Sequence, residues 1–600
     1  MTARPASPPD FDPLPHREAL VGIVRAVAER IAAGDLDTGA FDGILRRHPH
    51  AGRGFFSRSD IIAGYRAFFS GGSGEESLGV SEEAFLARVQ RRPVRTQSGV
   101  TPLTLLTKPF PCPGKCVFCP NDVRMPKSYL AAEPGAQRAA TNHFDPYLQT
   151  WNRLAAYRAI GHPTDKVEVI VLGGTWSFYP EAYLVWFATR CFEALNDFGA
   201  GIDARNRVEP SAPSFEELPA QIDGREHATN PYNRIVQAFL QQQLDGELVP
   251  PSERAGWDRL EAAQAANESA GCRSVGFVVE TRPDHVTEEE VLRIRRLGAT
   301  KVQIGIQSLD DAVLAANQRG HDVEATRQAI RRLRRAGFKI HAHWMPNLLA
   351  ATPESDVADF ARLFADPAIR PDELKIYPCS LVESAELMQY HARGEWRPYE
   401  HAELLDVLAS VLASVPSYCR VTRVIRDISS DDIVTGNQLT NFRQLAEQEV
   451  ANRGGVCRDI RSREIRGDDF DAETLSLRAT VYDAEVSEEH FLEFVTPEDR
   501  IVGFLRLSLP REKSFVVELG ESAVIREVHV YGASLGLGGR ANDKAQHRGL
   551  GGRLVEEAAR CARAAGYDRL AVISAIGTRD WYRKLGFESA GLYQVRPQAP

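Results

Sequence analysis

Six short apolar runs between residues 98 and 390 constrain the fold of this chain more than any other feature of its sequence. Each run is rich in aliphatic and β-branched residues, and a longer stretch with helical spacing separates it from the next, which is the pattern of βα units. The runs are 101–108, 167–172, 274–280, 301–307, 339–345 and 373–377. A closed β/α barrel has eight strands, so six predict a partial, TIM-like (β/α)6 barrel in an α/β protein, which we assign to residues 86–390.

Several of these predicted strands end in polar residues or glycines. The residues at the ends are Gly173, Gly174, Thr175, Glu280, Gln307, His343, Lys375 and Tyr377. The active site of a β/α barrel collects at the C-terminal ends of its strands, so we expect a site there. For Lys375 and Tyr377 the alternative is a buried pair that only supports the barrel. For Glu280 the alternative is a surface carboxylate at a strand end.

Three of the nine cysteines stand in one loop, KPFPCPGKCVFCPND, directly after the first predicted strand. Cys112, Cys116 and Cys119 have the spacing C-x3-C-x2-C. Three thiolates hold three irons of a 4Fe–4S cluster and leave the fourth iron open. A structural zinc ion needs a fourth protein ligand, and no His or Cys follows within a short distance. The spacing therefore favours the cluster over a zinc site or inert cysteines.

The other six cysteines are scattered along the chain, and we interpret them as buried apolar residues. The alternative is a second metal site, although the spacing of its candidate ligands matches no metal motif. Those candidates are Cys379, Cys419, Cys457, His341 and His343.

Residues 1–85 are predicted to be a helical, partly basic N-terminal segment. Apolar residues recur at helical spacing between Leu20 and Ile31, which predicts a helix over 17–33. Residues 41–100 hold nine arginines against six acidic residues, in a chain whose net charge is −9. Such a basic stretch is either a contact for nucleic acid or a solvated helix face.

A second α/β unit is predicted for residues 466–600, after an Arg-rich linker over 391–465. Its expected strands are 501–509, 523–531 and 569–574. The sequence QHRGLG, residues 546–551, lies between a strand and a strongly amphipathic helix. Backbone amides of a glycine-rich turn at a helix N-terminus bind anions, so Gly549 and Gly551 predict a phosphate site.

No apolar run approaches the length of a membrane span, and the N-terminus lacks the apolar core of a signal peptide. We therefore expect a cytoplasmic protein without a membrane partner. Structural disulfides are rare in that compartment, which also argues against a disulfide in the cysteine loop.

The cysteine spacing after a first strand resembles that of the radical S-adenosylmethionine enzymes. In those enzymes the open iron binds the methionine part of S-adenosylmethionine, and reductive cleavage releases a 5′-deoxyadenosyl radical. The resemblance implies that Gly173, Gly174 and Thr175 lie against the methionine ammonium group, where glycine allows a close approach. It also implies that Glu280 binds a ribose hydroxyl or the ammonium group, and that Gln307 belongs to the same site.

The second unit resembles the GNAT acetyltransferases, which bind acetyl-CoA. The motif Q-x-x-G-x-G is preceded by EVHV (527–530) and followed by GTRDWYRKLGF (577–587), in the order that this fold requires. The resemblance implies that Tyr582 lies near the thioester sulfur. A core tyrosine is the alternative.

From about residue 90 to its end, the chain is similar to the catalytic subunit of Elongator in its stand-alone prokaryotic form. The stretches that carry the similarity include RRPVRTQSGV (91–100), DKVEVIVLGGTW (165–176), ETRPDH (280–285), NQRGH (317–321) and ISAIGTRDWYRKLGF (573–587). The resemblance implies a transferase that makes 5-carboxymethyluridine at the wobble position, U34, of tRNA. Its cofactors would be a 4Fe–4S cluster, S-adenosylmethionine and, as co-substrate, acetyl-CoA.

The same resemblance implies roles for individual residues. Lys166 would contact acetyl-CoA from the barrel, and Lys375 and Tyr377 would position uridine or water. Residues expected along the pantetheine arm and before the pyrophosphate are Glu527, Val528, His529, Val530, Ala545, Gln546 and His547. The sequence departs from the family at Trp581 and Phe587, where tyrosines are expected, so a second hydroxyl facing acetyl-CoA is in doubt.

The expected partner is the anticodon stem-loop of tRNA, with Arg91, Arg92 and Arg95 as candidates for phosphate contacts. The sequence leaves open whether the chain forms a homodimer. Two rival hypotheses are a protein-lysine acetyltransferase with a structural cluster and a tRNA-binding subunit without catalysis. The intact cysteine trio and the glycine-rich motif argue against the second rival, because a scaffold needs neither.

Overall fold

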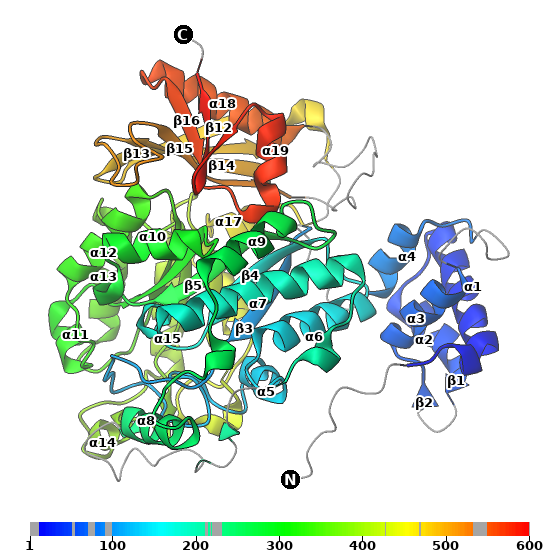
Figure 1. Cartoon of the computed structure of the whole chain (residues 1–600), viewed down its shortest axis with the longest axis horizontal. Helices are drawn as coiled ribbons and strands as arrows, with labels where there is room; N and C mark the ends of the chain where they lie inside the picture. Colours follow the sequence, from blue (N-terminus) through cyan, green and yellow to red (C-terminus); the bar gives the residue numbers. More distant parts are fainter. Residues whose placement is uncertain are drawn as a thin grey trace.

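The computed structural model describes residues 11–50, 54–69, 78–90, 99–209, 214–215, 218, 231–426, 428–466, 470–531 and 549–598. Figure 1 shows a helical N-terminal unit beside the main body, a central barrel domain, and a C-terminal domain at the top. Six of the predicted contact residues, Arg91, Arg92, Arg95, Ala545, Gln546 and His547, lie outside the described residues.

The N-terminal unit is a small helical bundle with its own apolar core. Its elements are α1 (Arg17–Ala33), α2 (Thr38–Arg47), α3 (Arg58–Phe68), α4 (Glu82–Val89) and the antiparallel pair β1 (Pro49–His50) and β2 (Gly54–Phe55). The helix expected over 17–33 is present, and Leu20, Val24 and Val27 are fully buried because they share one face. The unit contacts helix α6 (Pro146–Ala159) of the barrel domain, where Arg66 donates to the carbonyl of Arg158 over 2.6 Å.

All six predicted barrel strands are present, and a seventh extends the sheet. The strands are β3 (Thr101–Leu106), β4 (Lys166–Leu172), β5 (Arg273–Thr281), β6 (Lys301–Gln307), β7 (Lys339–Trp344), β8 (Glu373–Ile376) and β10 (Arg420–Val424). They pair in parallel and in chain order, so all their C-terminal ends meet at one edge. The α/β fold class with an open, partial barrel is thereby confirmed.

Helices follow the strands, and most of them pack on the outside of this sheet (Figure 1). They are α5 (Pro134–Thr141), α6, α7 (Glu181–Ala200), α8 (Tyr232–Gln243), α9 (Trp257–Asn267), α10 (Glu288–Arg296), α11 (Asp311–Ala316), α12 (Val323–Arg335), α13 (Pro353–Ala365), α14 (Leu387–Ala392), α15 (His401–Ser414), α16 (Phe442–Asn452) and α17 (Ile460–Arg463). Several helix starts are specified locally. Thr287, Asp322 and Thr352 cap α10, α12 and α13 by accepting hydrogen bonds from backbone amides of the first turn.

Residues 391–465, expected to be a linker, form part of the barrel domain. They contain α15, β10, α16 and α17, together with β11 (Ile433–Thr435), which pairs antiparallel with β9 (Leu381–Val382). Strand β10 has the sequence RVTRV, in which only the two valines are apolar and buried. The sequence therefore contains no apolar run that would predict this strand. Arg420 and Thr422 face a cleft, so the strand carries polar residues although it pairs with β8.

The C-terminal domain is built on a second, mostly antiparallel sheet. Its strands, in spatial order, are β12 (Ser476–Asp483), β13 (Ser487–Val495), β14 (Ile501–Pro510), β15 (Ala523–Val530), β16 (Arg569–Val572), β18 (Tyr593–Pro597) and β17 (Glu588–Ala590). The strands expected near 501, 523 and 569 are therefore present as β14, β15 and β16. Helix α18 (Leu550–Ala564) packs on β14 and β15, and α19 (Arg579–Lys584) follows β16.

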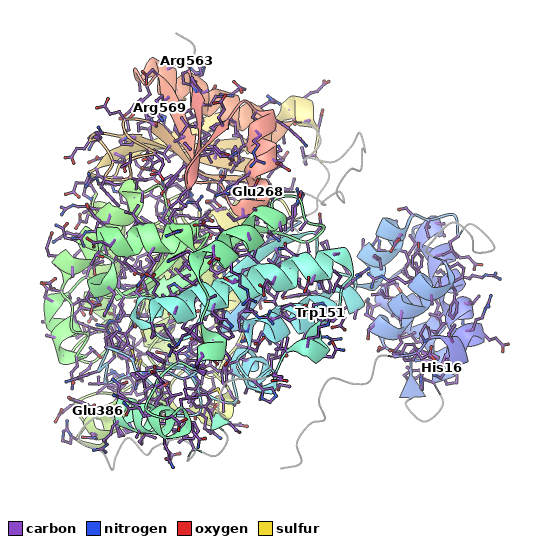
Figure 2. The ribbon with its side chains drawn as sticks, in the orientation of Figure 1. His16, Trp151, Glu268, Glu386, Arg563 and Arg569 are labelled. Atoms are coloured by element: carbon purple, nitrogen blue, oxygen red, sulfur yellow. The ribbon has the colours of Figure 1, made fainter. Side chains whose placement is uncertain are left out.

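Hydrogen bonds and ion pairs hold the C-terminal domain on the barrel. Glu268, which follows α9 and is labelled in Figure 2, pairs with Arg579 over 2.9 Å and also with Arg583. Arg295 of α10 donates to the carbonyl of Ser574 over 2.8 Å. None of the helices in the described ranges combines the length and apolarity needed to cross a bilayer.

Candidate functional site

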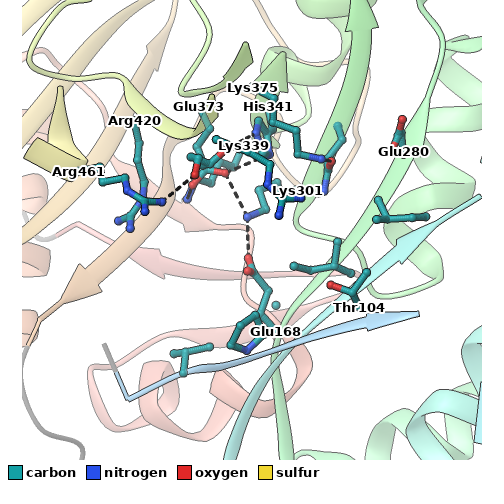
Figure 3. A pocket seen from close by; sticks show the side chains of 18 of the residues that line it. Thr104, Glu168, Glu280, Lys301, Lys339, His341, Glu373, Lys375, Arg420 and Arg461 are labelled. Carbon is teal, nitrogen blue, oxygen red and sulfur yellow. Dashed lines mark hydrogen bonds and ion pairs between the residues drawn. The ribbon is translucent and has the colours of Figure 1, made fainter. Parts of the chain in front are cut away.

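A cleft of about 2050 Å³ lies between the barrel sheet and the C-terminal domain. Its lining comes from the barrel strands on one side and from β14, β15, α18 and α19 on the other. Alternate residues of a strand point to the same face, which explains why Lys339, His341 and His343 of β7 all line the cleft. Figure 3 shows Lys339 and His341 close to Glu373, with Glu280 set apart from them.

The cleft connects the two ends of the barrel strands. Glu280, Gln307 and Tyr377 line it at or just beyond the C-terminal ends, where Cys119 also contributes. Lys166 lines it at the opposite end, as the first residue of β4. Strand β4 has seven residues. At about 3.3 Å per residue, the two ends of the cleft lie about 20 Å apart.

The three cysteines of the loop are all buried at the C-terminal end of the strands. Arg319 donates from Nη1 to the Sγ of Cys116 over 3.0 Å, and Cys119 Sγ lies 3.1 Å from Ser128 Oγ. A hydrogen bond from the Cys119 thiol holds the pKa of Cys116 well below its usual range, and the charge of Arg319 acts in the same direction. The same hydrogen bond raises the pKa of Cys119, so the surroundings favour the thiolate, the form in which cysteines bind iron, at Cys116.

The end of β4 lies directly beside the cysteine loop. Thr175 Oγ1 is 3.7 Å from Cys112 Sγ. Gly173 has a φ of 125°, and a Cβ atom on it would overlap Thr107 Oγ1. Position 173 therefore requires glycine, because any side chain would overlap Thr107, the residue that follows β3. This requirement does not depend on a ligand. Gly174 has a φ of 77° and more open surroundings, with Lys127 3.9 Å from an added Cβ.

Glu280, His343 and Lys375 lie together on the cleft wall. Burial raises the pKa of Glu280, whose Oε1 is 3.6 Å from His343 Nδ1. Gln303 joins the group, because its Oε1 is 3.0 Å from His343 Nε2 and accepts a hydrogen bond from Lys375. The ring of Tyr377 lies 6.0 Å from that of His343, between ring centroids. Lys375 and Tyr377, predicted as a pair at the end of one strand, therefore share a polar surface with Glu280 and His343.

Gln307 has an unusual backbone and an unsatisfied side chain. Its φ is 67°, in the left-handed region that non-glycine residues rarely adopt. Its buried Oε1 has no hydrogen-bond partner within the part of the chain that the structure describes. Strained residues and unpaired buried acceptors cluster at functional sites, which fits the position of Gln307 on the cleft.

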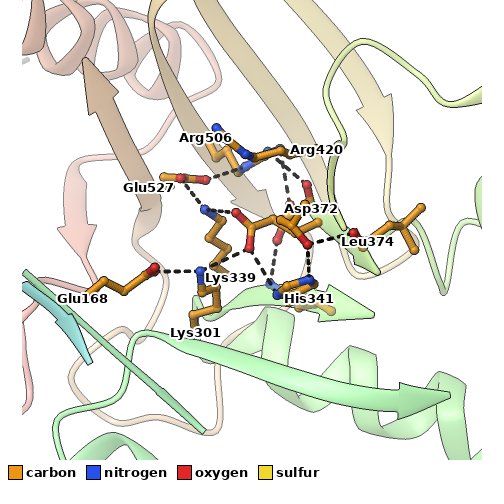
Figure 4. A network of polar contacts seen from close by, with 12 residues as sticks. Glu168, Lys301, Lys339, His341, Asp372, Leu374, Arg420, Arg506 and Glu527 are labelled. Carbon is orange, nitrogen blue, oxygen red and sulfur yellow. Dashed lines mark hydrogen bonds and ion pairs between the residues drawn. The ribbon is translucent and has the colours of Figure 1, made fainter. Parts of the chain in front are cut away.

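An alternating network of buried charges crosses from the barrel to the C-terminal domain (Figure 4). Lys301 pairs with Glu168 over 2.7 Å and with Glu373 over 3.1 Å. Lys339 pairs with Glu373 over 2.7 Å and with Glu527 of β15 over 2.5 Å. Lys301, Lys339 and Glu373 are the first residues of β6, β7 and β8, so β15 lies at the N-terminal ends of the barrel strands.

The C-terminal domain lines its side of the cleft with the residues predicted for acetyl-CoA. Those among the described residues are Glu527, Val528, His529, Val530, Gly549, Gly551 and Tyr582. Burial lowers the pKa of His529 to about 4, so its imidazole is neutral at pH 7. Gly549, with a φ of 70°, is the N-cap of α18, and a Cβ on Gly551 would lie 3.2 Å from the ring of Trp581.

The two departures from the expected tyrosines occupy different places. Trp581 is 38% exposed and lines the cleft, so it contributes a ring where a hydroxyl was expected. Phe587 is buried and packs against Tyr582, with ring centroids 5.5 Å apart.

The alternative of a second metal site is not supported. Cys379 packs in an apolar cluster with Leu381, and burial raises the pKa of its thiol to about 12. Cys419 is buried in the main core. Within the described ranges, no group of three His, Cys, Asp or Glu side chains is placed to hold a metal ion. In a 4Fe–4S cluster each thiolate binds a different iron, so the cysteine loop does not need such convergence.

Comparisons with known proteins agree with this architecture. Models of the Radical SAM superfamily, the Radical_SAM C-terminal domain and the Acetyltransferase (GNAT) family match residues 251–363, 371–452 and 461–587. A tRNA uridine(34) acetyltransferase of Dehalococcoides mccartyi is 35% identical over 509 residues, which cover 84% of this chain and 98% of the relative. The chain belongs to the Elongator complex protein 3 family. Elongator complex protein 3 of Danio rerio is 33% identical, over 86% of each chain.

A solved structure of the Elongator complex protein 3 family supports the same fold. The archaeal Methanocaldococcus infernus Elp3 with an N-terminal deletion (1–46) matches with a TM-score of 0.64 and 31% identity. The match covers 83% of this chain and 99% of that one. The family resemblance and the two-domain fold expected from the sequence are thereby confirmed.

Apart from Lys166, inspection of the sequence missed the charged residues at the N-terminal ends of the barrel strands of this Elp3-family chain. Lys301, Lys339 and Glu373 line the cleft, and each is the first residue of its strand. A usable signal was present, since β7 and β8 read KIHAHW and ELKI, with polar residues at every second position of otherwise apolar strands. The same alternation places His341 and Lys375 on the cleft.

Proposed function

We propose that this protein modifies uridine 34 of tRNA and builds 5-carboxymethyluridine from the acetyl group of acetyl-CoA. The observation that carries the proposal is the single cleft, which is lined both by the cysteine-loop end of the barrel and by the GNAT strand β15. A radical made at one end and a thioester held at the other need such a shared space. Relatives named tRNA uridine(34) acetyltransferase support tRNA as the substrate.

Cys112, Cys116 and Cys119 would hold a 4Fe–4S cluster, which when bound and reduced supplies the electron that cleaves S-adenosylmethionine. The strand ends beside this loop would bind the rest of that molecule. Thr175 lies next to Cys112, and Gln307 offers an acceptor without a partner among the described residues.

The proposed reaction balances with a one-electron carrier as reductant. One electron converts S-adenosylmethionine to methionine and a 5′-deoxyadenosyl radical, which takes a hydrogen atom from the acetyl methyl group. The resulting carbon radical forms a bond to uridine C5. Loss of the C5 proton, and of one electron to the oxidised carrier, restores the C5–C6 double bond. Water then cleaves the thioester, which releases coenzyme A and leaves the carboxymethyl group.

The residues of the cleft would orient the two substrates. Glu527 and His529 lie on the strand expected to pair with pantetheine, and Tyr582 faces the same space. The acetyl arm would enter near Lys166 and extend toward the C-terminal ends of the barrel strands. It would have to span the length of the cleft, which is about 20 Å. Lys375 would position uridine.

Basic residues on the cleft support RNA binding. Arginines of its lining include Arg138, Arg423, Arg443, Arg461 and Arg466. Such a group of cations neutralises phosphate charges, and the affinity that it provides decreases as the salt concentration rises. We propose that the N-terminal unit contributes further contacts to the anticodon stem-loop.

The test is a reaction with acetyl-CoA deuterated at the methyl group, under anaerobic conditions with transcript tRNA. We expect deuterium in 5′-deoxyadenosine and a labelled carboxymethyl group in the digested tRNA, both measured by mass spectrometry. Normal tRNA product without deuterium in 5′-deoxyadenosine would refute the mechanism. Absence of any modified nucleoside, with acetylated protein formed instead, would favour the protein-lysine acetyltransferase.

A further inference from the structure

Two stretches of the barrel, ETRPDH (280–285) and NQRGH (317–321), contain arginines to which the proposed function gives no role. Arg282 and Arg319 are 7% and 5% exposed, and both reach the cysteine loop. Arg319 Nη1 lies 3.0 Å from Cys116 Sγ, and Arg282 Nη1 lies 3.8 Å from the same sulfur. Two buried guanidinium groups thus converge on one of the three cysteines.

Contacts elsewhere hold both arginines in place. Arg282 donates from Nε and Nη2 to the two carboxylate oxygens of Asp284, each over 2.9 Å, and it also donates to the carbonyl of Arg319. Arg319 donates from Nη2 to the carbonyl of Gly305 over 2.6 Å. Because a guanidinium group is a rigid fork, these contacts fix where the remaining N–H groups point.

The cysteine loop itself is shaped to admit Arg282. A Cβ atom on Gly114 would overlap Arg282 Nη1. Gly114 lies between Cys112 and Cys116, so the loop can close over the guanidinium group only with glycine at this position. The approach of Arg282 to the sulfur is therefore built into the backbone of the loop.

The sulfurs of the other two cysteines lie beside neutral hydroxyl groups, whereas the buried cation Lys127 acts through its charge on all three sulfurs. Cys119 Sγ is 3.1 Å from Ser128 Oγ, and Cys112 Sγ is 3.7 Å from Thr175 Oγ1. Charge-assisted hydrogen bonds are roughly twice as strong as neutral ones. The strongest donors in the pocket therefore act on Cys116.

We propose that Arg319, assisted by Arg282, is a positioning residue that raises the reduction potential of the iron–sulfur cluster by donating hydrogen bonds to the Cys116 sulfur. This inference rests on the cysteine trio being the cluster ligands. Reduction adds one negative charge to the cluster, and a fixed cation hydrogen-bonded to a ligand sulfur stabilises that reduced state more than the oxidised one. The cationic pair would thus ease the electron transfer that precedes cleavage of S-adenosylmethionine.

The test compares reconstituted wild-type protein with Arg319→Gln in a redox titration followed by EPR. We expect the ratio of reduced to oxidised cluster at a fixed potential to fall about tenfold, which equals a shift of 59 mV to more negative potential. Iron content and affinity for S-adenosylmethionine should stay near the wild-type values. Arg319→Lys keeps the charge but loses the fork, so its potential should lie between the two.

Arg327→Gln is the matched control, because Arg327 lies on the outer helix α12 and pairs with the carboxylate of Asp366. Its potential should equal that of the wild type. If Arg319→Gln does not retain iron, Arg282→Gln provides the same test, with a smaller shift expected from its longer contact.

An unchanged potential in variants that retain the cluster would overturn the inference. Unchanged potential together with lost affinity for S-adenosylmethionine would assign Arg319 to the substrate carboxylate instead. Failure of the wild-type protein to form a 4Fe–4S signal would refute the cluster assignment itself, so the two failures are distinguishable.

Discussion

Asp372, directly before β8, is a buried acid that ties the C-terminal domain to the barrel. Arg526 of β15 donates to both of its carboxylate oxygens, over 2.6 and 2.7 Å. The backbone amide of Ile340 also donates to it, over 2.9 Å, and Arg506 lies 3.5 Å away. The side chains of Asp372 and Arg526 have no solvent exposure.

We predict that Asp372→Asn lowers the free energy of unfolding by about 3–5 kcal/mol, the usual cost of removing one partner from a buried ion pair. Asparagine has nearly the same volume, so no cavity contributes to the loss. The cost arises because Arg526 keeps its charge, loses one of its two carboxylate partners, and has no water to replace it. Glu489, 2.7 Å from Arg526, remains and limits the loss.

The effect should also depend on pH. Burial alone would raise the pKa of Asp372, but the charges of Arg526 and Arg506 outweigh it and hold the pKa below its usual value. The carboxylate therefore contributes its full stabilisation above the unfolded pKa of about 4, and loses it as the pH falls through the lower folded pKa. The difference between wild type and Asp372→Asn should be constant near pH 7 and should shrink in acid.

The measurement is urea denaturation of the protein without cofactors, followed by tryptophan fluorescence at pH 7 and at several acidic values. Asp580→Asn is the control, since Asp580 forms an exposed pair with Arg583 and its loss should cost less than about 0.5 kcal/mol. A loss below about 1 kcal/mol in Asp372→Asn would refute our view that this buried pair holds the two domains together.

Three further predictions concern the site. Cys116→Ser should bind less iron and cleave no S-adenosylmethionine, because a hydroxyl does not replace a thiolate as cluster ligand. Circular dichroism should show that the variant retains the fold. Full cleavage would contradict the cluster assignment. Gly549→Leu should abolish acetyl-CoA binding in calorimetry with the iron–sulfur spectrum intact, because position 549 has a φ of 70° that leucine rarely adopts; normal binding would count against the phosphate site. Replacing Arg91, Arg92 and Arg95 by alanine should weaken tRNA binding and flatten its salt dependence; an unchanged salt slope would return these arginines to a solvated surface.

The sequence alone was sufficient for the first six strands of the barrel and for the type of each domain. Apolar runs of strand length alternating with helical stretches predict a parallel sheet, because each run must be buried on both faces. The cysteine spacing predicts a cluster because it is a local property of one loop. It was not sufficient for β10, whose five residues include two arginines and a threonine. Such a strand is recognised only by its pairing with β8.

The tertiary structure alone decided which charges meet. Lys339 and Glu527 are far apart in the chain, and they pair only because β15 lies at the N-terminal end of β7. Arg319 likewise reaches Cys116 from a loop that follows a different strand. Periodicity along the chain specifies which face of a strand is apolar, whereas contacts between distant segments depend on strand order and domain docking. The sequence therefore indicated the chemistry of the cysteine loop, and only the folded chain joined that loop and the acetyl-CoA strand in one cleft.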